Sequence, residues 1–279
     1  MSTLTVAAAA PPSEPRALTY LHAFGALFAR DIRVLRRGLR PFVLRTVTQP
    51  LLFVFVFAFV LPRIGQSGGG SPGFSTVLVP GLVASGLVLQ GILAVTAPLV
   101  MELSYTREIE DRAMAPIPAW ALGLEKIVAG AAQALVAAVV VFPCVLLVHA
   151  KGQAPSVDYR RWALLIVVLL ASCLFTAAFG LWIGTVMEPT RLTSLFAVVM
   201  VPITMLGCVY YPWSALHSVR WLQIVVLANP MVYVSEGLRA ALTPNLPHLP
   251  LWVVIPVLLG GALAAGAWSL RLFAKRLVD

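Results

Sequence analysis

Long apolar runs, separated by short charged segments, set the pattern of this chain. A helix that crosses a bilayer needs about 20 mostly apolar residues, and the runs meet that length at several places. Arranged as helices, they predict six membrane spans. These spans cover about residues 44–62, 76–101, 124–148, 162–187, 191–211 and 249–271.

A further apolar stretch, 221–235, is too short to cross comfortably, so we predict a re-entrant helix pair over 212–246. Inside it stands NPMVYVSEGLRAAL. Asn229 can cap a helix and Pro230 fits the first helical position. That helix is expected to end near Leu242, where Thr243-Pro244 follows.

Tyr233, Glu236 and Arg239 fall on one side of this predicted helix. Glu236 and Arg239 stand three residues apart and can form an ion pair. Polar groups at membrane depth are costly unless they are paired or face water. We therefore expect the pair to hold a short helix in shape rather than to contact a transported molecule.

The segment 16–41, before the first span, predicts a basic amphipathic helix at the membrane interface. Apolar residues recur along it at helical spacing. The opposite side carries a basic stripe made of Arg30, Arg33, Arg37 and Arg40. Residues 1–15 lack a basic stretch before their short apolar run, so we interpret them as a disordered tail rather than a signal peptide.

Composition supports a membrane protein. Hydrophobic residues make up 60% of the 279 and charged residues 11%, against about 25% charged in soluble domains. The predicted fold class is all-α integral membrane. The net charge is +9, but the basic residues cluster outside the apolar runs, which favours membrane topology over nucleic-acid binding.

The distribution of basic residues also predicts orientation. With six spans, 14 of the 20 basic residues fall on the side of the termini and 6 on the other. Since basic residues concentrate on the cytoplasmic side, both termini are predicted to be cytoplasmic. The segment 102–123 then lies in the cytoplasm, and 212–246 lies outside.

The cytoplasmic segment is longer and more structured in its pattern than a simple loop. It opens with a cluster of charged residues and then turns apolar between prolines, which is typical of a docking element. The charged residues are Glu102, Arg107, Glu108, Glu110, Asp111 and Arg112.

The GLWIG pattern in the fourth predicted span, Gly180–Gly184, lets another helix approach closely. We favour packing within the chain over a contact between two chains.

Taken in order, these parts resemble the permease subunits of ABC-2 type exporters, the group with daunorubicin-resistance-like and nodulation-type permeases. The resemblance rests on the basic entry helix, RTVTQPLLFVFVFAFV at Arg45–Val60, the charged 102–126 segment and NPMVYVSEGLRAAL. In the last motif the matching positions are Asn229, Pro230, Tyr233, Glu236 and Arg239.

The resemblance implies a bacterial inner-membrane permease that pairs with a second permease, self or sister, and with two separate ATPase subunits. ATP and Mg²⁺ would bind those subunits. The 102–123 linker would couple to them, and the NPMVYVSEGLRAAL helix would belong to an external gate. The implied cargo is a lipid, lipid-linked glycan, polysaccharide or drug. We expect Glu236→Ala to reduce export and leave assembly intact.

Two alternatives were weighed from the residues themselves. An ion-coupled secondary transporter wants acidic residues within its spans, and the charge-free runs contain none. Gln90 and Gln133 are their main strongly polar side chains, for which we favour packing roles. An intramembrane enzyme finds no support, because the four histidines are isolated in sequence. We assign this chain no catalytic site, no metal site and no cofactor of its own.

Overall fold

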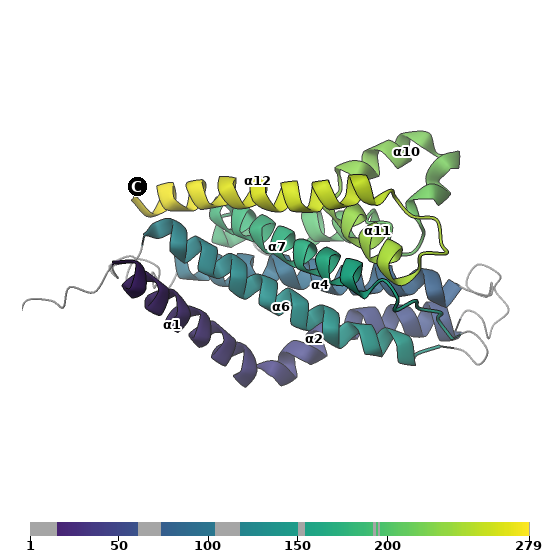
Figure 1. Ribbon diagram of the computed structural model, residues 1–279, viewed down its shortest axis with the longest axis horizontal. Helices are drawn as coiled ribbons and strands as arrows, with labels where there is room; N and C mark the ends of the chain where they lie inside the picture. The colour runs from purple at the N-terminus through teal and green to yellow at the C-terminus, as the bar shows by residue number, and fades with distance from the viewer. Residues whose placement is uncertain are drawn as a thin grey trace, which may run out of the picture.

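The computed structural model describes residues 16–60, 74–103, 118–149, 154–191, 194 and 196–278. Helices account for most of these residues, and none of them forms a strand. Four long helices run roughly along the long axis of the molecule and pack on one another (Figure 1). They are α4 (Phe74–Met101), α6 (Ala119–Leu147), α7 (Trp162–Val186) and α12 (Leu251–Val278).

The helix α4 lies at the centre of the bundle. In its most apolar stretch 83% of the residues are buried, against 22% in α12 and 17% in the helix that opens the bundle. It packs against α6, α7 and the short helix α11 (Pro230–Leu242). The outer helices are also apolar but remain uncovered, as expected where lipid rather than protein is the neighbour.

At the N-terminal side, α1 (Arg16–Arg37) turns at Gly38 into α2 (Leu39–Val54), which continues as the π-helix η1 (Phe55–Val60). The predicted interface helix 16–41 is therefore helical but shorter, and Arg40 belongs to the first turn of α2. The helix α1 packs against α6. Figure 1 shows α1 and the C-terminal end of α12 at the same end of the bundle, which we call the terminal end.

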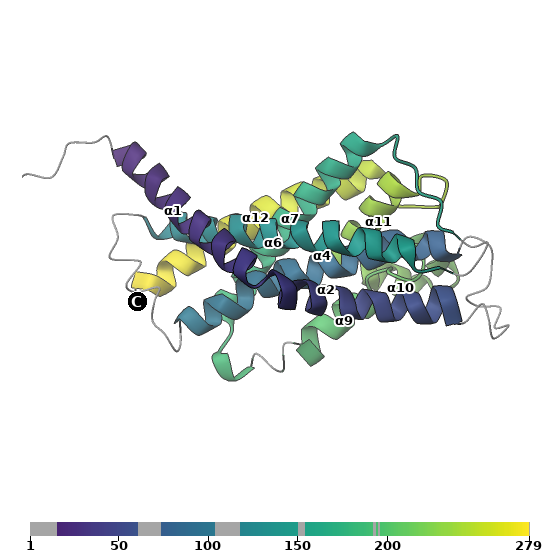
Figure 2. The same ribbon diagram turned by 90° about the horizontal axis from the view of Figure 1, so that it is seen from below.

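Five described helices are long and apolar enough to cross a membrane, and they match the first four and the last of the predicted spans. The predicted span 191–211 is different, so six helical spans are not confirmed. Its described residues form only η4 (Phe196–Met200) and α9 (Val201–Met205) before a non-helical segment, 206–212. The chain nevertheless leads here from the end of α7 toward α10 (Arg220–Val225) at the opposite end (Figure 2).

The residues 212–246, for which a re-entrant helix pair is predicted, contain a group of short helices; a re-entrant path stays a prediction. These are the 3₁₀ helices η5 (Trp213–Ser218) and η6 (Val226–Ala228), together with α10 and α11. They gather at the end of the bundle away from the terminal end (Figure 1). We call this the distal end.

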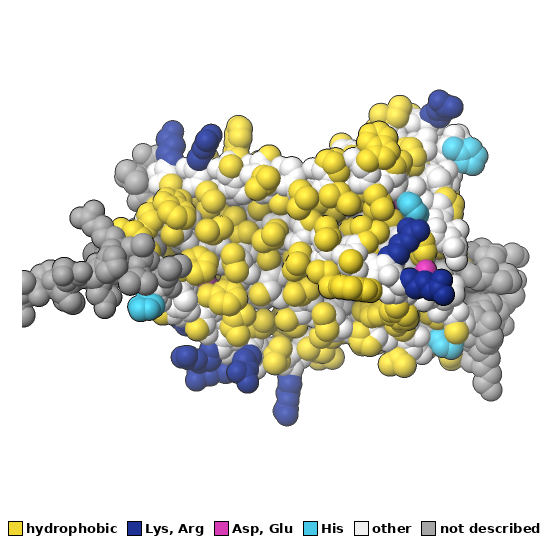
Figure 3. Space-filling model, in the orientation of Figure 1, with side chains coloured by type: hydrophobic (Ala, Val, Ile, Leu, Met, Phe, Trp, Pro, Cys, Tyr) yellow, Lys and Arg dark blue, Asp and Glu magenta, His cyan; other side chains and the backbone are white. Residues whose placement is uncertain are grey.

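The surface agrees with a membrane-embedded bundle. Figure 3 shows apolar side chains over the middle of the visible face, with Lys and Arg side chains toward its two ends. Large apolar residues are exposed on several helices, including Leu52 on α2, Val139 on α6, Ile166 on α7 and Leu263 on α12. In water such a surface would promote association, whereas in a bilayer it is the expected lipid contact.

Small residues let α7 approach α4 closely, as the GLWIG pattern predicts. A Cβ on Gly180 would come within 2.6 Å of the Ile92 carbonyl oxygen. The Gly180 carbonyl accepts a hydrogen bond from the Thr96 hydroxyl at 2.9 Å. The prediction of packing within the chain is thus confirmed for these helices.

We predict that Gly180→Ala destabilises the bundle, because its methyl group meets backbone that cannot rotate away. Overpacking of this kind costs about 1–3 kcal/mol. Gly260→Ala on α12 is the matched control, since a Cβ there meets nothing within 4 Å. Thermal unfolding in detergent should show a lower melting temperature for Gly180→Ala alone; equal melting of both variants would contradict this close packing.

Candidate functional site

The helix α11 begins as its sequence predicts. The Asn229 side chain accepts a hydrogen bond from the Met231 amide at 3.0 Å, and Pro230 occupies the first helical position. The side-chain Nδ2 of Asn229 also donates to the Ile203 carbonyl at 2.8 Å. Asn229 therefore caps its own helix and ties it to α9, which a sequence-based capping rule does not anticipate.

The predicted pair of Glu236 and Arg239 is present and completely buried. Both side chains are 0% exposed, and one Arg239 Nη donates to Glu236 Oε1. The other Arg239 Nη donates to the Cys208 carbonyl at 3.1 Å. Glu236 accepts two further hydrogen bonds, from the backbone amides of Trp213 and Leu249, each at 2.9 Å.

These bonds join three separate parts of the chain. Besides α11 itself, these are the stretch after α9, where Cys208 lies in the non-helical segment and Trp213 directly follows it, and the approach to α12, where Leu249 lies. We call the Glu236–Arg239 pair and these three backbone groups the ion-pair hub. Breaking an internal ion pair by removing one partner is far more costly than breaking an exposed pair, so the hub fixes the positions of all three segments.

The segment 206–212 depends on α11 for its hydrogen bonds. Helical bonding stops after α9, and Cys208 adopts a positive φ of 53°. The Ser235 hydroxyl donates to the Gly207 carbonyl at 2.7 Å, next to the bond from Arg239 to Cys208. Backbone polar groups in an apolar setting must be satisfied internally, and α11 supplies the side chains that do so.

Tyr233, another position of the predicted gate motif, binds the segment that leads into α11. Its hydroxyl donates to the Leu227 carbonyl at 2.8 Å. The structure thus brings all five motif positions together on α11 and its cap. The bonds described for these residues run to the chain's own backbone and to each other.

A second cluster of charged residues lies where α1, α4 and α6 meet. Lys126 Nζ is 2.8 Å from Glu102 Oε1 and 3.7 Å from Asp31 Oδ2. The Lys126 side chain is only 8% exposed. We call Asp31, Glu102 and Lys126 the root cluster, because they lie where the predicted linker joins the bundle. Glu102 is the first residue of that linker, directly after α4, and Lys126 lies in the first turns of α6.

Of the predicted coupling residues only Glu102 is described. The remaining five lie outside the described residues: Arg107, Glu108, Glu110, Asp111 and Arg112. The last part of the predicted linker is helical, since α6 begins at Ala119 and not at 124. Pro118 precedes this start in an extended conformation, which suits the residue before a helix.

The predicted basic stripe is exposed but spans a turn. Arg30, Arg33 and Arg37 project from α1, and Arg40 from α2. Arg30 also pairs with the neighbouring Asp31 at 3.3 Å. Exposed guanidinium groups of this kind suit contact with lipid headgroups.

Sequence reasoning missed Asp31, Lys126 and Ser235 as site residues. Asp31 is the one acidic residue in a strongly basic helix, which is a detectable signal. Lys126 has a weaker signal, as a cation at the start of an apolar run. Ser235 has none, because a serine in a helix ordinarily bonds its own preceding turn.

Comparison with known proteins decides the family. A profile described as ABC-2 type transporter matches residues 22–243. The match includes the root cluster and the ion-pair hub, except for Leu249. The chain belongs to the ABC-2 type transporter family. It is therefore an ABC-2 type transport permease, as its motifs predict.

Two relatives of this permease share one name with each other. The inner membrane transport permease YadH of Escherichia coli strain K12 is 26% identical over 222 residues, covering 79% of this chain and 82% of the relative. The permease of that name from Shigella flexneri gives the same identity and coverage.

We predict that Glu236→Ala prevents stable folding of the permease. The change leaves Arg239 and the Trp213 and Leu249 amides buried without their carboxylate, at a cost of about 3–5 kcal/mol. This differs from the sequence-based expectation that assembly survives. Glu188→Ala is the control, since the Glu188–Arg191 pair is exposed and contributes at most about 1 kcal/mol.

Yield and thermal unfolding of both purified variants measure the difference. Wild-type stability of Glu236→Ala would mean that the hub does not support the fold.

We predict that Lys126→Met loosens the junction of α1, α4 and α6, because Glu102 and Asp31 lose the cation between them. The expected result is a lower melting temperature and faster proteolysis near residues 104–117. Lys275→Met, at an exposed position near the end of α12, should leave both properties unchanged. Equal behaviour of the two variants would show that the root cluster is not a structural joint.

Proposed function

We propose that this permease is the membrane-spanning subunit of an ATP-driven exporter. The cargo is a hydrophobic or amphipathic molecule, such as a lipid, a lipid-linked glycan, a polysaccharide or a drug. It leaves from the cytoplasm or the inner leaflet. The observation that carries the proposal is the family match over 22–243, which extends from the root cluster at one end of the bundle to most of the hub at the other.

In this proposal two ATPase subunits bind ATP and Mg²⁺ and dock at the terminal end, with both termini in the cytoplasm of a bacterial cell. The 102–123 linker transmits their movement. The root cluster supports that assignment, because it anchors both sides of the linker to α1. A second permease copy, or a sister chain, completes the pathway.

The distal end then faces outward, and α11 with its neighbours forms the external gate. The hub gives this gate a rigid centre, since Glu236 and Arg239 bind three backbone groups from two further chain segments at once. Their complete burial favours a role in holding the gate's shape over contact with cargo. Movement at the gate would then involve the hub group as one body.

The mechanism is tested with the permease and its ATPase reconstituted in liposomes. Transport should require ATP and survive an uncoupler that collapses the proton gradient. Transport by the purified permease alone, without ATP and sensitive to the uncoupler, would instead support the ion-coupled alternative.

For the coupling linker we predict that Glu108→Lys or Asp111→Lys lowers transport-linked ATP hydrolysis roughly tenfold. A factor of this size is typical of the coupling between two sites. Charge reversal in the linker should oppose docking of the ATPase while the bundle stays folded. Glu188→Lys is the matched control, an exposed acidic residue close to the terminal end of α7. Unchanged coupling in both linker variants would place the contact elsewhere.

A further inference from the structure

A polar pocket of ≈ 420 Å³ opens at the distal end, where the segment 154–161 meets the start of α4 and the end of α11. We call it the distal pocket. Most of its polar side chains come from Thr76, Ser156, Asp158, Arg160 and Asn245. The pocket therefore offers hydroxyl groups, a carboxylate, a guanidinium group and an amide within one space. It shares no residue with the ion-pair hub or the root cluster.

Hydrogen bonds hold the walls of the distal pocket in place. The Ser156 amide donates to the Thr76 hydroxyl at 3.0 Å, which joins the segment 154–161 to α4. The Asp158 amide donates to the Leu242 carbonyl at 2.9 Å, which joins it to the end of α11. A ligand would meet a site that is already formed, and this lowers the ordering cost of binding.

Asp158 and Arg160 bring opposite charges to this pocket. The Arg160 amide donates to Asp158 Oδ1 at 2.9 Å, so both side chains leave the same tight turn. No ion pair formed by the described residues includes either side chain. An anionic and a cationic group that lie near each other without pairing fit a ligand that carries both charges.

The pocket lies at the level of lipid headgroups. Trp162 begins α7 and is 65% exposed, and exposed tryptophan is typical of the membrane–water interface. The helix α7 extends about 38 Å, slightly more than the ~30 Å of a bilayer's hydrocarbon core. Arg160 precedes Trp162 by two residues, so its guanidinium group lies near the phosphate groups rather than the hydrocarbon.

An apolar crevice of ≈ 200 Å³ between α6 and α7 adjoins the pocket. Leu242 lines both spaces. Leu165 and Leu169 line the crevice about 5 Å and about 11 Å past Trp162 along α7. Val139 of α6, also in its lining, is 63% exposed. The crevice is thus open to the bilayer and can take a hydrocarbon chain while the headgroup stays in the pocket.

We propose that the distal pocket and this crevice hold one bilayer phospholipid whose headgroup carries a primary ammonium group, namely phosphatidylethanolamine. The guanidinium group of Arg160 binds the phosphate oxygens, which it suits in geometry. The ammonium group donates a charge-assisted hydrogen bond to the Asp158 carboxylate. The hydroxyl groups of Thr76 and Ser156 and the Asn245 amide supply further polar contacts, and one acyl chain lies between α6 and α7.

Charge complementarity selects this headgroup. Phosphatidylglycerol has no cation for Asp158. Phosphatidylcholine has a cation, but its nitrogen carries no hydrogen to donate. The bound lipid contacts α4, the segment 154–161 and α11 at once, so it stabilises the end of α11. The inference does not depend on the proposed function, because its occupant is a resident lipid and not cargo.

Binding is tested on the full chain in neutral maltoside detergent, by competition against phosphatidylethanolamine with a photoreactive diazirine in its acyl chain. We expect unlabelled phosphatidylethanolamine to compete about tenfold better than phosphatidylcholine or phosphatidylglycerol, since only its headgroup donates to the carboxylate. N,N-Dimethylphosphatidylethanolamine, with one remaining N–H, should lie between them. Equal competition by all these lipids would overturn the headgroup site.

Two variants separate the roles of the charges. Asp158→Asn removes the carboxylate and keeps the oxygen that accepts the Arg160 amide, so the turn should stay intact. Phosphatidylethanolamine should then compete within twofold of phosphatidylcholine. Arg160→Gln should instead weaken both lipids about fivefold and keep their ratio, because both carry phosphate.

The controls are Glu188→Gln and Arg220→Gln, at exposed charged positions outside the pocket. Both should behave as the wild type. An unchanged advantage of phosphatidylethanolamine in Asp158→Asn, or the same loss in the controls, would overturn the site.

Mapping the photo-crosslinks tests the crevice. They should fall on α6 and α7 near Val139 and Leu165. Val139→Trp, which fills the open side, should weaken phosphatidylethanolamine and phosphatidylcholine equally, whereas Leu263→Trp, at a similarly exposed position of α12, should not. Crosslinks confined to other helices, or equal binding to both tryptophan variants, would overturn this half of the proposal.

Reconstitution with the ATPase in liposomes distinguishes a resident lipid from cargo. Movement of labelled phosphatidylethanolamine between leaflets should be the same for the wild type and Asp158→Asn, with and without ATP. ATP-driven movement that Asp158→Asn abolishes would identify cargo and overturn the resident assignment. The binding assay needs no ATPase, so its failure would leave the proposed function standing.

Discussion

The fold at the distal end depends on one buried ion pair. Glu236 and Arg239 neutralise each other, and three further hydrogen bonds join them to the backbone of Cys208, Trp213 and Leu249. The Arg239 Nε has no hydrogen-bond partner among the described residues. A buried ion pair repays its desolvation only when further hydrogen bonds satisfy the charged atoms. Here the partners are backbone amides and carbonyls that lie outside regular helices or at their starts, where helical hydrogen bonds do not reach them. The pair therefore replaces, with side chains, the backbone bonding that the broken stretch after α9 gives up.

These side-chain hydrogen bonds explain why the predicted span 191–211 can be non-helical over part of its length and still pack within the bundle. Pro202 lies in the first turn of the short α9, which ends at Met205, and the chain then bends through Cys208 with a positive φ. Non-helical backbone among apolar helices is tolerated where protein groups surround it. Gly81 of α4 permits that approach, since a Cβ there would collide with the Val209 carbonyl oxygen.

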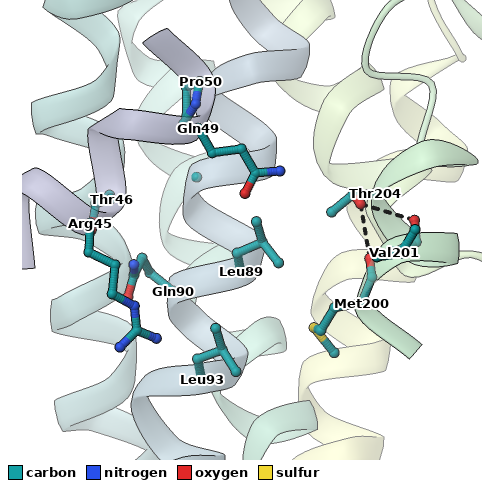
Figure 4. A pocket seen from close by; sticks show the side chains of 11 residues that line it. Arg45, Thr46, Gln49, Pro50, Leu89, Gln90, Leu93, Met200, Val201 and Thr204 are labelled. Atoms are coloured by element: carbon teal, nitrogen blue, oxygen red, sulfur yellow. Dashed lines mark hydrogen bonds between the residues drawn. The ribbon is translucent and has the colours of Figure 1, made fainter. Parts of the chain in front are cut away.

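The two charged clusters each join separate elements at opposite ends of the molecule. The root cluster joins three helices beside the linker, and the ion-pair hub joins the short segments at the distal end. Between them α4 is packed on almost all sides, whereas α2 presents an open apolar face. A cavity lined by Arg45, Gln49 and Gln90, among others, lies beside α4 (Figure 4).

The sequence by itself determined the all-helical class, five of the spanning helices, the limits of α11 and the family, because apolar periodicity, capping residues and short motifs are local signals. It also predicted that Glu236 and Arg239 pair. Only the tertiary structure decided what that pair binds, because its partners are backbone groups, and every residue has the same amide and carbonyl whatever its side chain. The same holds for the span at 191–211: its composition is apolar throughout, and its interruption is stable only because α11 packs beside it. Arg45 and Gln90 are 45 residues apart in the chain, and their shared cavity exists only once α2 and α4 are packed together.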